Sequence, residues 1–280
     1  MDIQADLTKF NISPDPLKDQ FFLSDENLIA KMVDLADINK RDIVLEVGAG
    51  IGNLTRPLAK LAAKVIAYEI DTRFKPPLST LPSNVEIHYE DAWDFVQLHG
   101  KFKKKKVYNK MVSNLPYSFS EQLLHNLTFW DYDKVILLVP LKFIQTVNSH
   151  PIFKSFFIPK LCLKVDKSKF YPQPKTNSAV IDLLKLPDPI STQNLPLYLR
   201  QYLYQHEDQL VKNSLREGLI EFAIASQGVK LSKKQAADII KCSGINPALL
   251  GSTPSGSEIY DDMDSKFQSV DFRHYSSASS

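Results

Sequence analysis

Cysteine is scarce in this sequence: Cys162 and Cys242 are the only two among 280 residues. Their separation fits no zinc or iron–sulfur ligand spacing, so the sequence predicts no metal site. One pair of cysteines also cannot form the framework of a disulfide-stapled fold. The composition therefore favours a reduced, intracellular protein.

Long apolar runs and a strong net charge are absent as well. No apolar run approaches the roughly 18–20 residues that a membrane-spanning helix needs, and the N-terminal stretch MDIQADLTKF lacks the basic-then-apolar layout of a signal peptide. We therefore expect a cytoplasmic protein that does not enter a membrane. The net charge of +2 does not by itself indicate a polyanionic partner, so only local charge clusters can argue for one.

Short apolar runs rich in β-branched residues alternate with segments of helical periodicity over the first half of the chain. This alternation predicts an α/β fold with a parallel or mostly parallel sheet and right-handed crossovers. Residues 156–184 predict an antiparallel hairpin at the sheet edge, around a proline-rich turn. The expected strands cover residues 42–48, 64–71, 84–92, 107–115 and 133–140, and the expected helices cover residues 54–63 and 26–36, the latter with Ser24 as its N-cap.

A change of composition near residue 187 predicts a domain boundary. Residues 186–192 include Pro187 and Pro189 and have the composition of a linker, after which the chain has the periodicity of several helices. The expected domains are residues 1–186 and a small helical domain at residues 187–280. Serine and aspartate dominate from about residue 251, which predicts a disordered tail.

A glycine-rich turn, EVGAGIGNLT, follows the first expected strand and opens a helix. Gly48, Gly50 and Gly52 let a ligand approach the backbone, and the helix N-terminus offers free N–H groups. Glu69 ends the next strand, where an acid can accept hydrogen bonds from both ribose hydroxyls. The glycine turn and Glu69 together indicate an adenosine-containing cofactor, either a dinucleotide or S-adenosylmethionine (SAM). The glycines are also typical of a helix packed tightly on a strand. Asp71 is interpreted as a solvated turn residue.

Asp91 closes the third expected strand, with Ala92 next to it. An acid there can accept a hydrogen bond from the exocyclic amine of a bound adenine, but it is equally typical of an N-cap for a following helix. The three loops follow adjacent parallel strands, whose carboxyl ends form the ligand-binding edge of open α/β sheets.

The fourth expected strand ends in MVSNLPYSF, residues 111–119. The Asn114 amide oxygen and a nearby backbone carbonyl can accept hydrogen bonds from a target amine and hold it for methyl transfer. Pro116 fixes the turn that aims this carbonyl, and the ring of Tyr117 offers a stacking face for an extruded base. A proline turn with a capping asparagine is an equally good interpretation of these residues in isolation.

The order of EVGAGIGNLT, YEID, EDA, NLPY and FYPQPKTNSAV resembles the KsgA-type ribosomal RNA adenine dimethyltransferases over about residues 17–184. The resemblance implies a class I methyltransferase fold, which is Rossmann-like with a mostly parallel seven-stranded sheet, an antiparallel edge hairpin and a small C-terminal helical domain. The chain departs from the family pattern at Phe21, where the family has a polar residue, and at residues 206–208, where the family has a basic stretch.

The resemblance also assigns roles to individual residues. Asn114, Leu115, Pro116 and Tyr117 fall at the target-amine site, and Phe170 matches an aromatic residue that helps to clamp the target base. The implied cofactor site, for SAM, contains Gln20, Leu23, Gly48, Gly50, Glu69, Ile70, Asp91, Ala92 and Asn114.

The activity that the resemblance implies is dimethylation of adjacent adenines in a terminal hairpin loop of small-subunit rRNA, with the free rRNA or a pre-ribosomal small subunit as partner. A monomer is expected. Two alternatives remain at this point. One is a large-subunit rRNA adenine methylase of the antibiotic-resistance type, and the other is a non-catalytic nucleic-acid-binding relative.

Lysines gather in KFKKKK, residues 101–106, just before the fourth strand. Such a run is typical of a solvated loop, but beside an active site it can bind RNA phosphates without sequence preference. In the small domain only a few basic residues, Arg200 among them, are candidates for the same role. The predicted RNA-binding residues are Lys103, Lys104, Lys105, Lys106, Lys175, Lys212 and Arg216.

Overall fold

The computed structural model describes residues 3–92, 107–254, 258–268 and 270–275, apart from the side chain of Tyr117. The chain forms two compact units, of which the first comprises Met1–Val147 and Ile158–Leu184 and the second comprises Asn148–Phe157 and Lys185–Ser280. The expected division after residue 186 differs in two respects, because it placed residues 148–157 and residues 185–186 in the first domain. Within the second unit, the Ser155 carbonyl accepts a 2.8 Å hydrogen bond from Gln201 Nε2, which helps to hold this segment there.

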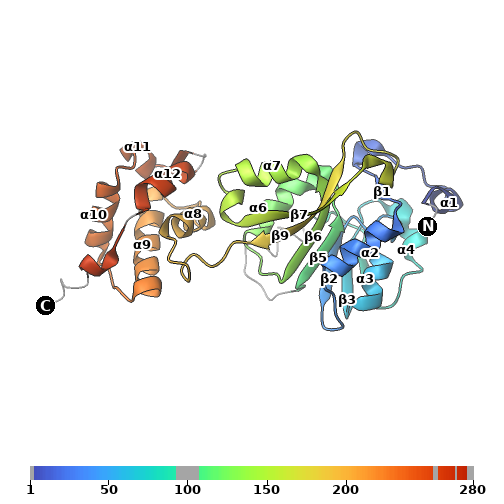
Figure 1. Cartoon of the computed structure of the whole chain (residues 1–280), viewed down its shortest axis with the longest axis horizontal. Helices are drawn as coiled ribbons and strands as arrows, with labels where there is room; N and C mark the ends of the chain where they lie inside the picture. Colours follow the sequence, from blue (N-terminus) through green and yellow to red (C-terminus); the bar gives the residue numbers. More distant parts are fainter. Residues whose placement is uncertain (1–2, 93–106, 255–257, 269, 276–280) are drawn as a thin grey trace. The chain divides into compact units, whose positions relative to one another are not determined.

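The first unit is built on a seven-stranded sheet with the strand order β4-β3-β2-β5-β6-β9-β7 (Figure 1). Neighbouring strands from β4 to β6 are parallel, whereas β9 pairs with β6 in the antiparallel direction. The predicted mostly parallel sheet with an antiparallel edge is confirmed. The strands are β2 Ile43–Val47, β3 Lys64–Tyr68, β4 Val85–His88, β5 Lys110–Asn114, β6 Lys134–Pro140, β7 Phe157–Val165 and β9 Ser178–Lys185.

Consecutive residues of the central strands are buried, as expected for a parallel sheet that is covered on both faces. Val44 and Leu45 of β2 are fully buried, and so are Met111 and Val112 of β5. Helices α2 and α3 lie side by side against the sheet (Figure 1). The helices are α1 Ile3–Lys9, α2 Glu26–Leu35, α3 Thr55–Leu61, α4 Lys75–Leu78, α6 Ser120–Leu127 and α7 Leu141–Ser149, and the 3-10 turns are η1 Pro16–Lys18, η2 Thr72–Phe74, η3 Tyr117–Phe119 and η5 Lys167–Lys169.

The N-cap of α2 is Asp25, whose side chain accepts a 3.0 Å hydrogen bond from the Leu28 N–H. The prediction of Ser24 as N-cap is wrong, because Asp25 is the residue directly before the first helical turn. The Ser24 hydroxyl instead donates to the Lys169 carbonyl at 2.9 Å. This bond extends a two-stranded antiparallel sheet of β1 (Phe22–Leu23) with β8 (Phe170–Tyr171), which anchors the chain segment that precedes α2.

The second unit is helical, and a buried arginine joins three of its segments. Arg200 is 5% exposed. Its Nε donates to the Tyr260 carbonyl at 2.8 Å and its Nη1 to Ser155 Oγ at 3.3 Å. Its Nη2 forms an ion pair with Asp264 at 2.6 Å. Arg200 is therefore a structural residue, and its interpretation as a basic candidate for RNA contact is wrong. The elements of this unit are η4 Phe153–Ser155, α8 Leu195–Gln205, α9 Val211–Gln227, α10 Lys233–Ser243, α11 Pro247–Leu250, α12 Glu258–Phe267 and η6 Phe272–Tyr275.

The prediction of a disordered tail from about residue 251 is wrong for residues 258–268 and 270–275. This part of the chain contains α12 and η6, and both bury apolar side chains. The apolar residues of α12 recur at helical spacing within a segment rich in acids, so the polar composition concealed an amphipathic helix. The buried residues are Ile259, Tyr260, Met263, Phe267 and Phe272.

Candidate active site

A pocket of about 210 Å³ opens at the carboxyl ends of the parallel strands in the first unit. Loops that follow β2, β3, β4 and β5 contribute to its wall, as expected for a ligand site in an open α/β sheet. The segment before α2 contributes the remaining wall. Ten residues predicted to bind cofactor or target line the pocket: Gln20, Leu23, Gly48, Gly50, Glu69, Ile70, Asp91, Ala92, Asn114 and Pro116.

The turn after β2 requires glycine at two positions. Gly50 has a φ of +56°, and a Cβ added to it would lie 2.9 Å from Cε1 of Phe22. Gly48 has a φ of +81°, and a Cβ there would lie 3.5 Å from the Pro116 ring. The left-handed backbone and the close neighbours together exclude a side chain at Gly50. At Gly48 the turn passes directly beside the loop that carries the predicted target-amine site.

The Glu69 carboxylate is nearly buried at the end of β3, and backbone groups hold both of its oxygens. Oε2 accepts a 2.7 Å hydrogen bond from the Gly50 N–H, and Oε1 accepts a 2.8 Å hydrogen bond from the Asp71 N–H. Burial raises the pKa of Glu69, against these hydrogen bonds, which lower it. Each oxygen retains a lone pair for one further donor, which is the capacity that a pair of ribose hydroxyls requires.

Glu46, the last but one residue of β2, also lines the pocket, and the residue-by-residue interpretation of the sequence missed it. Burial, with the nearby charge of Glu69 as a smaller cause, raises the pKa of Glu46 to about 8. Its Oε2 is buried with no hydrogen-bond partner among the residues that the structure describes. An acid at the end of a strand, directly before a glycine turn, was the signal that could have revealed it.

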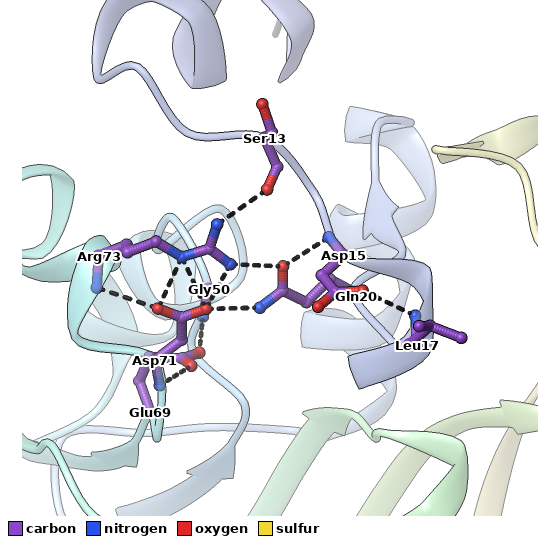
Figure 2. Close-up of polar contacts among 8 residues, drawn as sticks. All are labelled: Ser13, Asp15, Leu17, Gln20, Gly50, Glu69, Asp71 and Arg73. Carbon is purple, nitrogen blue, oxygen red and sulfur yellow. Dashed lines mark hydrogen bonds and ion pairs between the residues drawn. The ribbon is translucent and has the colours of Figure 1, made fainter.

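A polar network fixes the segment before α2 against the loop after β3 (Figure 2). Gln20 Nε2 donates to Asp71 Oδ2 at 2.9 Å, and Gln20 Oε1 accepts from the Asp15 N–H at 2.8 Å. Arg73 pairs with Asp71 through Nη2 at 2.6 Å and through Nε at 3.0 Å, while its Nη1 donates to the Ser13 carbonyl. The Arg73 guanidinium is the main cause that holds the pKa of Asp71 well below its usual range.

Asp71 is therefore not the solvated turn residue that the sequence suggested. Its side chain is only 7% exposed because Gln20 and Arg73 cover it. The Gln20 side chain lines the pocket, but its amide is engaged in holding the chain segment in place. The contact with Gln20 cannot be foreseen from Asp71 and its immediate neighbours, since Gln20 lies 51 residues away in the chain.

The loop after β5 places Asn114 in the wall of the same pocket. The Asn114 Nδ2 donates a 2.9 Å hydrogen bond to the Phe21 carbonyl, so its amide oxygen points away from Phe21 and is the atom that can accept from a target amine. The Pro116 carbonyl accepts from the Phe119 N–H at 3.0 Å, which leaves the Leu115 carbonyl as the better second acceptor. The Leu115 side chain is buried, and the Tyr117 side chain lies outside the described residues.

Residues 17–241 match the family described as ribosomal RNA adenine dimethylase. The chain belongs to this family. The match covers most of both units. It confirms the predicted family and the prediction that the protein is a SAM-dependent methyltransferase.

Curated relatives agree with this membership of the rRNA adenine dimethylase family. A Methanococcus maripaludis protein named probable ribosomal RNA small subunit methyltransferase A is 33% identical over 75% of this chain and 84% of its own length. A relative of the same name from Pyrococcus furiosus is 32% identical over 81% of this chain and 84% of its own length. The ribosomal RNA small subunit methyltransferase A of Thermotoga maritima is 30% identical over 77% of each chain.

Solved structures show the same fold. A dimethyladenosine transferase from Plasmodium falciparum aligns with a TM-score of 0.53 at 20% identity, over 88% of this chain and 97% of that one. The 23S rRNA methyltransferase ErmE aligns with a TM-score of 0.52 at 20% identity, over 89% of this chain and all of that one. These likenesses confirm the predicted class I methyltransferase fold.

SAM, the cofactor of the rRNA adenine dimethylases, fits the residues of this pocket. Glycines 48 and 50 leave room beside the backbone, and Glu69 presents two acceptors to a ribose. The unpartnered Glu46 oxygen adds a buried polar atom that a polar group of a bound ligand can satisfy. Two further acids, Glu90 and Asp91, also line the pocket.

The predicted clamp residue of this family member, Phe170, is not at the pocket. Its ring is 5% exposed and packs in the hydrophobic core of the first unit, and β8 pairs it with Leu23 of β1. The role of Phe170 as a clamp for the target base stays a prediction, and its position makes it a support for Leu23, which does line the pocket. Phe21, the departure from the family pattern, contacts Asn114 through its backbone carbonyl, a group that every residue type supplies.

The predicted RNA contacts receive no structural test. Lys103, Lys104, Lys105 and Lys106 lie outside the described residues. Lys175 and Lys212 are exposed, whereas Arg216 is half-buried and forms an ion pair with Glu217 at 2.9 Å. An RNA-binding role stays a prediction for all of them, and Arg216 would have to exchange Glu217 for a phosphate.

Neither a metal site nor a membrane span is found in the part of the chain that the structure describes. Across those stretches, no group of three or more His, Cys, Asp or Glu side chains is arranged to hold a metal ion. Within the same coverage, no helix is both long and apolar enough to cross a membrane.

Proposed function

We propose that this protein uses SAM to dimethylate the N6 amines of adjacent adenines in a terminal hairpin loop of small-subunit rRNA. One observation carries the proposal: the glycine turn and the Asn114 loop form one pocket, in which Gly48 lies against Pro116. A cofactor held by the glycine turn and a base held by the Asn114 loop would therefore meet within the same cavity.

The chain's own residues divide the binding of SAM among three loops. We assign the ribose hydroxyls to Glu69, the adenine amine to Asp91 with Ala92 beside it, and the methionine end to the turn of Gly48 and Gly50. The Glu46 carboxyl, at the base of this turn, faces the same end. When bound, SAM supplies the electrophilic methyl group.

The target amine needs activation, because its lone pair is delocalised into the purine ring. The Asn114 amide oxygen and the Leu115 carbonyl would each accept one N–H of this amine, which draws the nitrogen toward a tetrahedral and more nucleophilic form. Both acceptors are dipoles held in advance by the fold, so they need little reorganisation during the reaction. The proton that the nitrogen loses passes to solvent, since neither acceptor is a base strong enough to keep it.

The names of the curated relatives support the small subunit rather than the large subunit as the source of the RNA. Relatives from Methanococcus maripaludis, Pyrococcus furiosus and Thermotoga maritima all carry the name ribosomal RNA small subunit methyltransferase A, with or without the word probable. The likeness to ErmE is at 20% identity and supports the fold only. The presence of Asn114 in the pocket wall argues against a non-catalytic relative.

The proposal extends to the cellular setting. We infer that the protein acts in the cytoplasm as a monomer, on a pre-ribosomal small subunit, and that its helical second unit docks on the RNA. Lys212 and Arg216, both in α9, are the residues of that unit that we predict to contact phosphate.

Mass-spectrometric mapping of dimethyladenosine tests the function. The purified protein is incubated with labelled SAM and either a small-subunit assembly particle or naked large-subunit rRNA, with Asn114→Ala as the inactive control. We expect two adjacent dimethyladenosines in the small-subunit RNA and none in the other. Labelling of the large-subunit RNA alone would favour the resistance-type activity, and no labelling of either RNA would favour a binding protein.

A further inference from the structure

Three consecutive residues, Asp19, Gln20 and Phe21, contact the two loops that flank the pocket, and we call them the strap. Asp19 Oδ2 accepts a 2.8 Å hydrogen bond from the Ser118 N–H. Gln20 Nε2 donates to Asp71 Oδ2 at 2.9 Å, and the Phe21 carbonyl accepts from Asn114 Nδ2 at 2.9 Å. The strap therefore joins the loop after β3, on the cofactor side, to the loop after β5, on the target side.

The strap is held at both of its ends. On the N-terminal side, the 3-10 turn η1 precedes it, and the Asp15 N–H donates to Gln20 Oε1. On the C-terminal side, it runs directly into β1, which pairs with β8. Asp19 itself has a φ of +56°, a left-handed conformation that aspartate, asparagine and glycine tolerate better than other residues. A chain fixed in this way can position whatever it contacts.

The contact of Asp19 with Ser118 satisfies a specific need of the target loop. The first N–H groups of a helical segment have no partner within it, and a carboxylate is a favourable acceptor for them. Ser118 lies in η3, which leads into α6, and Phe119 at the start of α6 provides no side-chain cap. Asp19 supplies this cap from a distant part of the chain, 99 residues before Ser118. It thereby fixes the turn that follows Asn114 and Leu115.

We propose that Asp19 is a positioning residue for methyl transfer, which acts through Ser118 on the two amine acceptors, Asn114 and Leu115. Within the same strap, Gln20 acts on the cofactor side through Asp71, so the strap couples the cofactor loop to the target loop. The inference rests on the proposed methyltransferase function and deepens it. It predicts different kinetic signatures for neighbouring residues: loss of Asp19 changes turnover, whereas loss of Gln20 changes SAM binding.

Two substitutions separate the hydrogen bond of Asp19 from its backbone conformation. Asp19→Gly keeps the left-handed backbone and removes the acceptor, whereas Asp19→Asn keeps both. Asp37→Gly is the control, because Asp37 is an exposed aspartate of the first unit that also has a positive φ, of 48°. Turnover and KM are measured with the small-subunit particle as substrate, and the Kd of SAM is measured by calorimetry.

We expect Asp19→Gly to lower kcat by about 10- to 100-fold, because a small misplacement of the reacting groups costs a rate factor of this size. Its Kd for SAM should stay within about twofold of the unchanged protein, and Asp19→Asn should recover most of the turnover. Gln20→Ala should instead raise the Kd for SAM by about 5- to 10-fold, the effect of one lost hydrogen-bond network.

The outcomes distinguish the inference from the function on which it rests. Equal turnover of Asp19→Gly and the unchanged protein would overturn the strap inference alone. The strap inference also fails if Asp19→Asn is as slow as Asp19→Gly, or if Asp37→Gly is equally slow. No transfer by the unchanged protein on either ribosomal RNA would overturn the proposed function and this inference with it.

Discussion

The Gly50 N–H donates a 2.7 Å hydrogen bond to Oε2 of Glu69, which lies 19 residues further along the chain. The bond joins the glycine turn after β2 to the acid at the end of β3, so that the two parts of the cofactor site support each other. The same carboxylate also holds the Asp71 N–H, and Asp71 in turn binds Gln20 of the strap. A substitution at Glu69 should therefore disturb both the glycine turn and the loop after β3, on the cofactor side of the pocket.

Glu69→Ala should weaken SAM binding by about 10- to 100-fold, because a hydrogen-bonded carboxylate contributes roughly 1.5–3 kcal/mol. The variant loses the acceptors for the ribose and also the bonds to Gly50 and Asp71. Calorimetric titration with SAM measures the effect, with Glu121→Ala, an exposed acid of α6, as the control. An unchanged affinity of the Glu69 variant would contradict the ribose assignment.

Asn114→Ala should separate cofactor binding from chemistry. The variant retains Gly48, Gly50 and Glu69, so the Kd of SAM should change little. Methyl transfer should fall by about 100-fold or more, the loss typical of removing one preorganised group that stabilises a transition state. Single-turnover transfer from labelled SAM is the measurement. Transfer rates within a few-fold of the unchanged protein would refute the role given to this amide.

Gly50→Ala should destabilise the first unit and reduce SAM affinity. The new Cβ would lie 2.9 Å from the Phe22 ring, which packs against Phe74 at a centroid distance of 5.7 Å. Gly228→Ala is a matched control, because Gly228 also has a positive φ, of +69°, but no described atom lies within 4 Å of its added Cβ.

Gly50→Ala and Gly228→Ala should each be destabilised by about 1–2 kcal/mol, because alanine is strained in a left-handed backbone conformation. Only Gly50→Ala should add a steric cost and weaken SAM binding, because only Gly50 lies in the pocket wall. Thermal unfolding and calorimetric titration of the two variants measure these effects. Equal SAM affinities for both would show that the space at Gly50 is not needed.

Glu46→Gln should change the pH dependence of stability in the absence of SAM. Burial raises the pKa of Glu46 from 4.5 to about 8, so the folded state holds a proton that the unfolded state releases between these values. The stability that this group contributes is complete below pH 4.5 and is lost as the pH rises to about 8. Glutamine does not titrate, so the variant should lose less stability across this window, by an amount on the order of a few kcal/mol.

Denaturant unfolding between pH 5 and about 8, followed by tryptophan fluorescence, measures this difference. Trp130 is buried in the first unit, so its signal reports on the unit that contains Glu46. Glu121→Gln, the same substitution at an exposed acid of α6, is the control. Parallel profiles for Glu46→Gln and the unchanged protein would contradict a protonated Glu46.

The residues that local pattern identified are those whose position follows from strand order. Asn114 ends a strand of the parallel sheet, and Gly50, Glu69 and Asp91 lie within three residues of a strand end; the carboxyl ends of parallel strands meet at one edge of the sheet. Their convergence on one pocket was therefore predictable from residue types and spacing. Glu46 has the same origin, and only its place inside a buried strand concealed it.

Two of the incorrect predictions have a different origin, because each depends on a partner that is remote in the chain. Asp71 resembles a turn residue until Gln20 covers it, and Arg200 resembles a surface cation until Ser155 and Asp264 surround it. The burial of the Phe170 ring likewise follows from the pairing of β8 with β1, which is remote in the chain.

The arrangement of the loops around the pocket follows from short-range information: β-branched runs form strands, glycines allow the turns, and polar residues follow the strand ends. Some polar side chains face the pocket, whereas others, as in the strap, form hydrogen bonds that hold the loops in place. Only tertiary contacts decided which side chains do which. The physical reason is that a carboxylate or amide has the same hydrogen-bonding capacity everywhere, and its role depends on which donors the fold brings within about 3 Å.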